Sequence, residues 1–185
     1  YAETVIVGFE RELFRRTSLE LSFVDKATRD VLEDTCVENY PTPTNTTECS
    51  AFIILNLPQA RRDYQAWLLN FESRAIDRLH ILASYTYSDT KGSTHSSTAA
   101  AEFDQYPYHY VNTYGYLGAH RQHRVKLNGY TRLPWDIGIG FSGAWTSPFR
   151  WAPRERGRNV DPAVFHPVFL EPRGSREGDS WSQLD

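Results

Sequence analysis

Hydrophobic and polar residues alternate with a period of two along six segments of this chain. The clearest segment is HRVKLNGYTRL, where Val125, Leu127 and Leu133 are separated by polar residues. Because successive side chains of an extended strand point to opposite faces, this period predicts strands with one apolar and one polar face. Ile6 and Leu68 are exceptions, since each is apolar but falls on the polar side. The predicted strands are residues 4–13, 18–26, 63–72, 79–88, 123–133 and 137–146.

The connections between these strands alternate strictly in length. FRRT, SRAIDR and PWD are short, whereas the segments at about 27–62, 89–122 and 150–179 are long and contain most of the Pro, Gly and Thr. All short turns should therefore lie at one end of a sheet and all long loops at the other. Sandwiches with Greek-key connections seldom sort their loops in this way, but outer-membrane barrels do, with long loops on the extracellular side.

The aromatic residues help to decide which medium the apolar face meets. Several fall toward the predicted strand ends, where a girdle at the lipid headgroups would need them. They are Trp67, Phe71, Tyr85, Tyr87, Trp135 and Trp145. We therefore predict an all-β fold, an antiparallel up-and-down transmembrane β-barrel with lipid outside and a polar lumen.

Composition is consistent with that fold and narrows the class of partner. The 185 residues carry a net charge of -3 with a pI near 6.1, and basic residues are scattered among acidic ones, so nucleic acid is not expected as a partner. Aromatic residues make up 14% of the chain. No apolar run reaches the roughly 18 residues of a transmembrane helix, whereas spanning strands need only about 9 to 11.

Both ends of the chain suggest a piece of a longer polypeptide. The sequence contains no Met and opens directly on the strand-like run YAETVIVGFE. It closes on DSWSQLD, which resembles the start of a seventh strand. We expect residues 1–185 to contribute about six to seven strands to a larger barrel, either through processing or because only part of the chain is represented.

Cys36 and Cys49 enclose a polar segment rich in Pro, Thr and Asn that shows no periodicity. Two cysteines this close across a loop predict a disulfide in an oxidising compartment such as the periplasm or the cell surface. The bond would contribute about 3 kcal/mol in the loop-entropy model. Two unpaired thiols are the alternative, and a zinc site is not expected because no His lies at ligand spacing.

A tyrosine-rich segment, YPYHYVNTYGYLGAHRQH, is the candidate for contact with a ligand, because such loops bind by stacking and hydrogen bonding. Its candidate residues are Tyr106, Tyr108, His109, Tyr110, Tyr114 and Tyr116. Simple packing of the loop is the alternative. His120 and His123 would share a metal only with difficulty, since positions three apart in an extended chain face opposite sides. We predict no metal and no cofactor.

Charged residues on the predicted polar face do not form a catalytic arrangement. Glu10, Glu20, Glu72, Lys126 and Arg132 would project into the lumen and hydrate or pair there. Nothing indicates a water-excluding pocket around the carboxylates, so we predict no enzymatic activity. The basic run RERGR, residues 154–158, could contact lipopolysaccharide phosphates, although a solvated charge run is more common.

The second half of the chain resembles a known family. RRDYQAWLLNFESRAIDRLHILASYTYSDTKG, a long loop and HRQHRVKLNGYTRLPWDIGIGFSGAW are similar to the C-terminal half of the barrel in TonB-dependent outer-membrane receptors, most of all the Oar-like group. The shared features are the R-x-Y opening, the SYTYS strand and the H-R-x-K-L-x-G strand, over residues 61–150. The resemblance implies a barrel of about 22 strands closed by an N-terminal plug and energised through TonB. This chain contains neither plug nor TonB box.

Three functions follow from these observations. The first is a segment of a TonB-dependent transporter in the bacterial outer membrane that binds or moves a bulky peptide, protein or glycan. Its partners would be outer-membrane lipid, lipopolysaccharide, the plug domain and the TonB complex. The second is a barrel without transport, serving as an adhesin or secretion pore. The third is a soluble secreted β-sandwich that binds carbohydrate, which would bury Leu21, Trp67 and Phe141 in one dry core.

Overall fold

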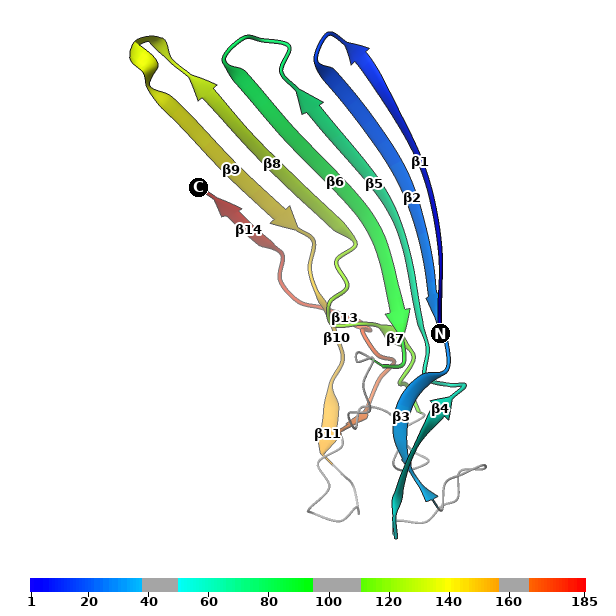
Figure 1. Cartoon of the computed structure of the whole chain (residues 1–185). Coiled ribbons are helices and arrows are strands. Elements are labelled where there is room, and N and C mark those ends of the chain that lie inside the picture. The colour runs from blue at the N-terminus through cyan, green and yellow to red at the C-terminus, as the bar shows by residue number, and fades with distance from the viewer. Residues whose placement is uncertain (38–49, 95–110, 157–166) are drawn as a thin grey trace.

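One large antiparallel sheet dominates the structure, a computed structural model that describes residues 1–37, 50–94, 111–156 and 167–185 (Figure 1). Seven strands lie side by side in the order β1–β2–β5–β6–β8–β9–β14. Neighbouring strands of this sheet follow one another in the sequence, as in an up-and-down barrel, and the other labels belong to short strands in the long connections. Their bounds are β1 Ala2–Phe14, β2 Thr17–Thr28, β5 Arg62–Ser73, β6 Leu79–Gly92, β8 His123–Arg132, β9 Gly138–Thr146 and β14 Trp181–Leu184.

The six predicted strands and the start of the seventh are confirmed. Three short turns join β1 to β2, β5 to β6 and β8 to β9 at one end of the sheet, drawn at the top of Figure 1. Each turn contains a non-glycine residue with a positive φ angle, namely Arg16, Arg78 and the pair Trp135 and Asp136. The last turn includes a short 3₁₀ segment, Pro134–Asp136. The long connections all leave from the opposite end, which we call the loop end.

The long connections contain short strands that the sequence analysis did not predict. β3 (Val31–Cys36) pairs with β4 (Phe52–Leu57), β10 (Arg150–Trp151) with β13 (Arg176–Glu177), and β11 (Arg154–Arg156) with β12 (Pro167–Phe169). β7 (Gly115–Tyr116) pairs with the end of β6. β7 lies at the loop end beside β6, and the β3–β4 and β11–β12 pairs lie beyond that end (Figure 1). The predicted loop at 27–62 is therefore partly a β-hairpin, whose base holds a small core of Val31, Leu57 and Ala60.

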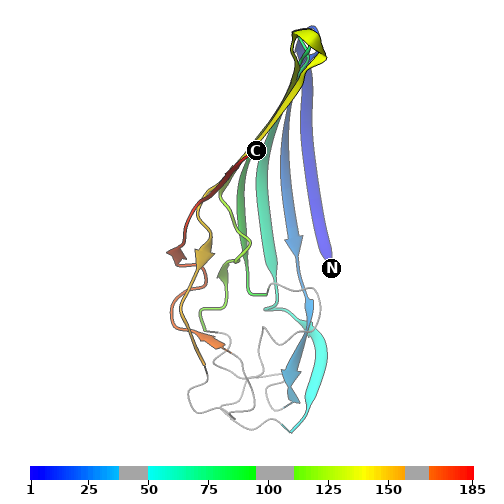
Figure 2. The ribbon, with the colours of Figure 1, turned by 90° about the vertical axis from the view of Figure 1, so that its left-hand side faces the viewer.

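The large sheet is a single curved layer, which is visible when it is turned by 90° (Figure 2). Among the described residues no second sheet of comparable length covers either face. Leu21, Trp67 and Phe141 share one face but remain 42%, 49% and 36% exposed. The sandwich alternative, which needs these three side chains in a common dry core, is therefore wrong.

The register of the sheet separates the side chains into an apolar and a polar face. One row of the apolar face crosses five strands through the paired residues Leu21, Leu69, Tyr85, Val125 and Trp145. A row of the polar face crosses the sheet through Glu10, Glu20, Asn70, Ser84, Lys126 and Ala144. Ile6 and Leu68 lie on the polar face, as the alternation indicates. No helix in the described part of the chain is long and apolar enough to cross a membrane.

Candidate functional site

The polar face is the first candidate surface for function. Glu20 lies directly opposite Glu10 on the neighbouring strand, and its carboxylate accepts hydrogen bonds from the Asn70 amide at 3.1 Å and the Ser22 hydroxyl at 2.9 Å. Glu10 and Glu20 also line an open hollow of about 230 Å³ together with Asn128 and other residues. This surface therefore presents carboxylates and amides in an open hollow.

Glu72 belongs to a second polar group, closer to the short turns. Its Oε1 atom lies 2.9 Å from Arg74 Nη2 and 3.2 Å from His80 Nε2. These side chains are all partly exposed, so the ion pair with Arg74 contributes little to stability. The pairing agrees with the prediction that charges on this face hydrate or pair with one another.

The apolar face carries an aromatic band near the loop end. Phe23, Trp67, Tyr87 and His123 are consecutive partners across β2, β5, β6 and β8. The Phe23 and Trp67 ring centroids are 4.8 Å apart, and the Tyr85 hydroxyl is hydrogen-bonded to His123 Nδ1 at 2.8 Å. Trp135, in a short turn at the other end, is 89% exposed. Aromatic side chains at the two ends of an apolar band match the two interfaces of a bilayer.

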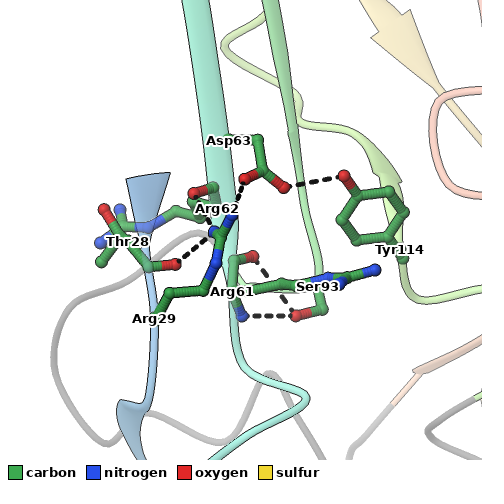
Figure 3. A network of polar contacts seen from close by, with 7 residues as sticks. All are labelled: Thr28, Arg29, Arg61, Arg62, Asp63, Ser93 and Tyr114. Carbon is green, nitrogen blue, oxygen red and sulfur yellow. Dashed lines mark hydrogen bonds and ion pairs between the residues drawn. The ribbon is translucent and has the colours of Figure 1, made fainter. Parts of the chain in front are cut away.

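At the loop end, a network of polar contacts ties the long loops to the sheet (Figure 3). The Arg29 guanidinium forms an ion pair with Asp63 and donates to the backbone oxygen of Arg62 at 3.1 Å. Ser93, which is buried, accepts a hydrogen bond from the Arg61 backbone N–H at 3.0 Å and donates to the Gln59 carbonyl at 2.7 Å. The loop ends of β2, β5 and β6 are thereby fixed relative to one another.

Tyr114 and Tyr116, two of the predicted ligand-contact residues, take part in this anchoring. The Tyr114 hydroxyl donates to Asp63 Oδ2 at 2.9 Å, and its ring lies 4.5 Å from the Arg61 guanidinium carbon (Figure 3). Desolvation, and then the Asp63 carboxylate, raise the pKa of Tyr114, so the hydroxyl remains a donor. The Tyr116 ring has Lys91 Nζ 4.7 Å from its centroid. Packing, the alternative for this loop, therefore accounts for these two residues.

His120 is buried beside the Tyr116 ring, with 4.5 Å between ring centroids. Its Nδ1 atom accepts the backbone N–H of Thr90 at 3.2 Å, which requires the neutral ring with its proton on Nε2. Burial lowers the pKa of His120. The positive charges of Arg150, Lys91 and Arg121 lower it further, whereas the negative charge of Asp89 raises it. This histidine therefore serves as an acceptor within the loop packing.

Arg173 connects the two later loops. It is 4% exposed, donates to the backbone oxygen of Ser93, and lies with its guanidinium carbon 5.2 Å from the centre of the Phe169 ring. Gly115 makes this packing possible, because a β-carbon there would lie 2.0 Å from the Arg173 backbone oxygen. The sequence analysis did not identify Arg173, and no alternation marks it in the sequence.

The remaining predicted site residues fall mostly outside the part of the chain that the structure describes. Tyr106, Tyr108, His109 and Tyr110 lie there, and so does Cys49. Cys36 ends β3, where its backbone pairs with Phe52. Both the ligand-contact loop and the disulfide therefore stay predictions.

A comparison with protein-family models gives one match, which covers residues 1–147 with a family described as "Outer membrane beta barrel domain". The matched region extends from β1 through β9 and so includes all three short turns. No curated protein and no solved structure matches the sequence. The family match identifies a barrel. It does not identify a transport mechanism or a substrate. Together with the two-faced sheet and the sorted loops, it shows that the chain belongs to the outer membrane β-barrel family and lies in the bacterial outer membrane.

Proposed function

We propose that this chain is part of a wide barrel of the TonB-dependent receptor type, which binds or moves a bulky substrate. The observation that carries the proposal is that parts of the polar face carry only small side chains. On β9, Gly140, Ser142 and Ala144 follow one another along that face. Gly8, Ser22 and Thr86 share another row of it, in which Leu68 is the one large side chain between them. The interior of an eight-stranded barrel is filled by its own side chains, whereas this face leaves room for a plug or an aqueous channel.

The edges of the sheet support the same proposal. Among the strands that the structure describes, β1 and β14 each have one neighbour in the large sheet. A strand in hydrocarbon needs both of its edges paired, because unsatisfied backbone groups are costly there. The proposal therefore places a further strand beside each of these two edges, which a barrel of many strands supplies.

The anchored loop end fits a receptor. Arg29, Asp63, Ser93, Tyr114 and Arg173 hold the long loops against the strand ends, so a binding surface at the barrel mouth would be preorganised. We also propose that the apolar face contacts lipid and lipopolysaccharide. The proposed role involves no enzymatic activity. The bulky substrate would be a peptide, protein or glycan.

The test uses the complete native polypeptide that contains this chain, reconstituted in planar bilayers. A plugged receptor should conduct little steady current and should be captured by the purified periplasmic domain of TonB. A barrel that serves as a secretion pore should conduct steadily, and an adhesin should show no TonB binding. Steady open conductance without TonB capture contradicts the proposal.

A further inference from the structure

An open hollow of about 530 Å³ lies at the loop end of the polar face, between β8, β9 and β14. Arg124, Thr146 and Trp181 are paired in register on these three strands and line it from the sheet. Arg121 and Phe149 line it from the adjoining loop segments. We call this group the arginine–tryptophan hollow.

The two arginines of the hollow are held in place but not neutralised. Arg121 Nη1 donates to the carbonyl oxygens of Gly118 at 3.0 Å and His120 at 2.7 Å. Arg124 Nη2 donates to the Ala119 carbonyl at 3.1 Å. Within the described ranges no carboxylate lies at ion-pair distance from either guanidinium, and each keeps further N–H groups for a ligand.

The two positive charges also disfavour each other. Burial lowers the pKa of Arg121 first, and the charge of Arg124 lowers it further. An anion placed between two fixed guanidinium groups relieves this repulsion and accepts charge-assisted hydrogen bonds, which are stronger than neutral ones. The two arginines outnumber Asp179, the one carboxylate that lines the hollow, so the charge of the hollow still favours a carboxylate or phosphate.

Aromatic rings form the other part of the hollow. Trp181 is an aromatic residue on the polar face, and it is 51% exposed. The Phe149 ring lies 5.3 Å from the Arg121 guanidinium carbon. Gly178 leaves space for that ring, since a β-carbon there would lie 2.2 Å from it, and the Gly178 N–H donates to the Phe149 carbonyl at 2.8 Å. The backbone therefore holds an aromatic surface beside the arginines.

We infer that the arginine–tryptophan hollow binds an anionic saccharide, with a sugar ring on Trp181 and the acidic group on Arg121 and Arg124. Asp179, Thr146 and the nearby Ser180 also line the hollow and provide acceptors for sugar hydroxyls. A purely aliphatic anion would leave these acceptors unused. The inference rests on the proposed function only in assigning the polar face to the lumen.

Isothermal titration of the complete native polypeptide in detergent tests this inference, with trigalacturonate as the anionic probe and maltotriose as the neutral one. Trigalacturonate should bind at least about tenfold more tightly. Arg124→Gln should lower that affinity by roughly tenfold, and Trp181→Ala by about five- to tenfold. Heat-dependent mobility in gels confirms that each variant is folded, and Trp181→Phe, which keeps a ring, should retain most of the affinity.

Matched control variants remove the same groups from the opposite face. Arg11→Gln deletes one positive charge there, because Arg11 pairs with Leu19 on the apolar face, and Trp145→Ala removes a tryptophan side chain of the neighbouring strand. Both should bind trigalacturonate like the native protein. Equal affinity for the two sugars, or equal losses in the controls, overturns the inference. So does competition by inorganic phosphate as strong as that by trigalacturonate. Binding in detergent needs no TonB, so a negative result here is distinct from a failure of the conductance test.

Discussion

Replacing Leu127 by Arg measures which medium the apolar face of the sheet meets. Leu127 is 41% exposed and lies between Ala83 and Gly143 on the neighbouring strands. It is four residues from the start of β8 and five from its end. With a rise of about 3.4 Å per residue and a strand tilt of about 40°, each end of β8 is about 10 to 13 Å away along the membrane normal. Since the apolar band of such barrels is about 25 Å tall, Leu127 lies near its middle.

An arginine at this depth should lower the free energy of unfolding by about 2 to 4 kcal/mol. That change corresponds to about a 30- to 900-fold shift in the unfolding equilibrium. The matched control is Asn128→Arg, which places the same group one residue further along the same strand but on the polar face, opposite Leu82 and Ser142. There the guanidinium meets water or carboxylates, so the change should stay within about 0.5 kcal/mol.

The assay is reversible denaturant unfolding of the complete native polypeptide in phospholipid vesicles, followed by tryptophan fluorescence. The difference between the two variants is more informative than either value, because both share strand, length and charge. Equal costs for Leu127→Arg and Asn128→Arg, or a larger cost for Asn128→Arg, would refute the assignment of the apolar face to lipid.

Three further predictions concern the loop end. Gly115→Ala should destabilise the loop packing by about 1 to 3 kcal/mol in thermal unfolding, because its β-carbon would lie 2.0 Å from a backbone oxygen, whereas Gly140→Ala, with 3.8 Å of clearance, should be tolerated. Tyr114→Phe removes the hydrogen bond to Asp63 and should increase hydrogen exchange in the loop by an amount equivalent to about 1 kcal/mol; unchanged exchange would contradict the anchoring role. Burial lowers the pKa of His120 in the folded loop. The stabilisation that depends on neutral His120 should therefore be fully present above the pKa of His in the unfolded chain, about 6.5, and should be lost as the pH falls through the lowered pKa of the folded state. Hydrogen exchange between about pH 7.5 and 5 should show this loss, and His120→Gln should flatten it.

The strands were predictable because the membrane imposes a strict pattern on each of them. Val125 and Leu127 reveal β8 by alternation alone, and a short turn such as PWD marks the end of a hairpin without any tertiary information. The β3–β4 hairpin was missed because its two strands lie beyond the membrane-spanning part of the sheet, where no such pattern is imposed. The run FIILNL was a usable signal, since a short apolar run followed by Pro is typical of a strand.

The loop-end site was less accessible to sequence reasoning. Tyr114 was identified as a candidate for ligand contact, but its partner Asp63 lies 51 residues away in the sequence. Arg173 and Ser93 are separated by 80 residues. Such contacts depend on which strand ends meet at the barrel mouth, and a period-two pattern carries no information on that point. The arginine–tryptophan hollow has the same origin, because Trp181 reaches it only through pairing of β14 with β9.

The three short turns also have a consequence for the way the protein assembles. Each joins two strands that pair along most of their length, so β1–β2, β5–β6 and β8–β9 can each form by closing a chain segment of only a few residues. Closure over so short a distance has a small entropic cost and is fast, whereas pairing between hairpins must bring together residues separated by the long loops. Hairpins are therefore the natural units in which this part of the wall forms, and the pairing of one hairpin with the next is the slower step.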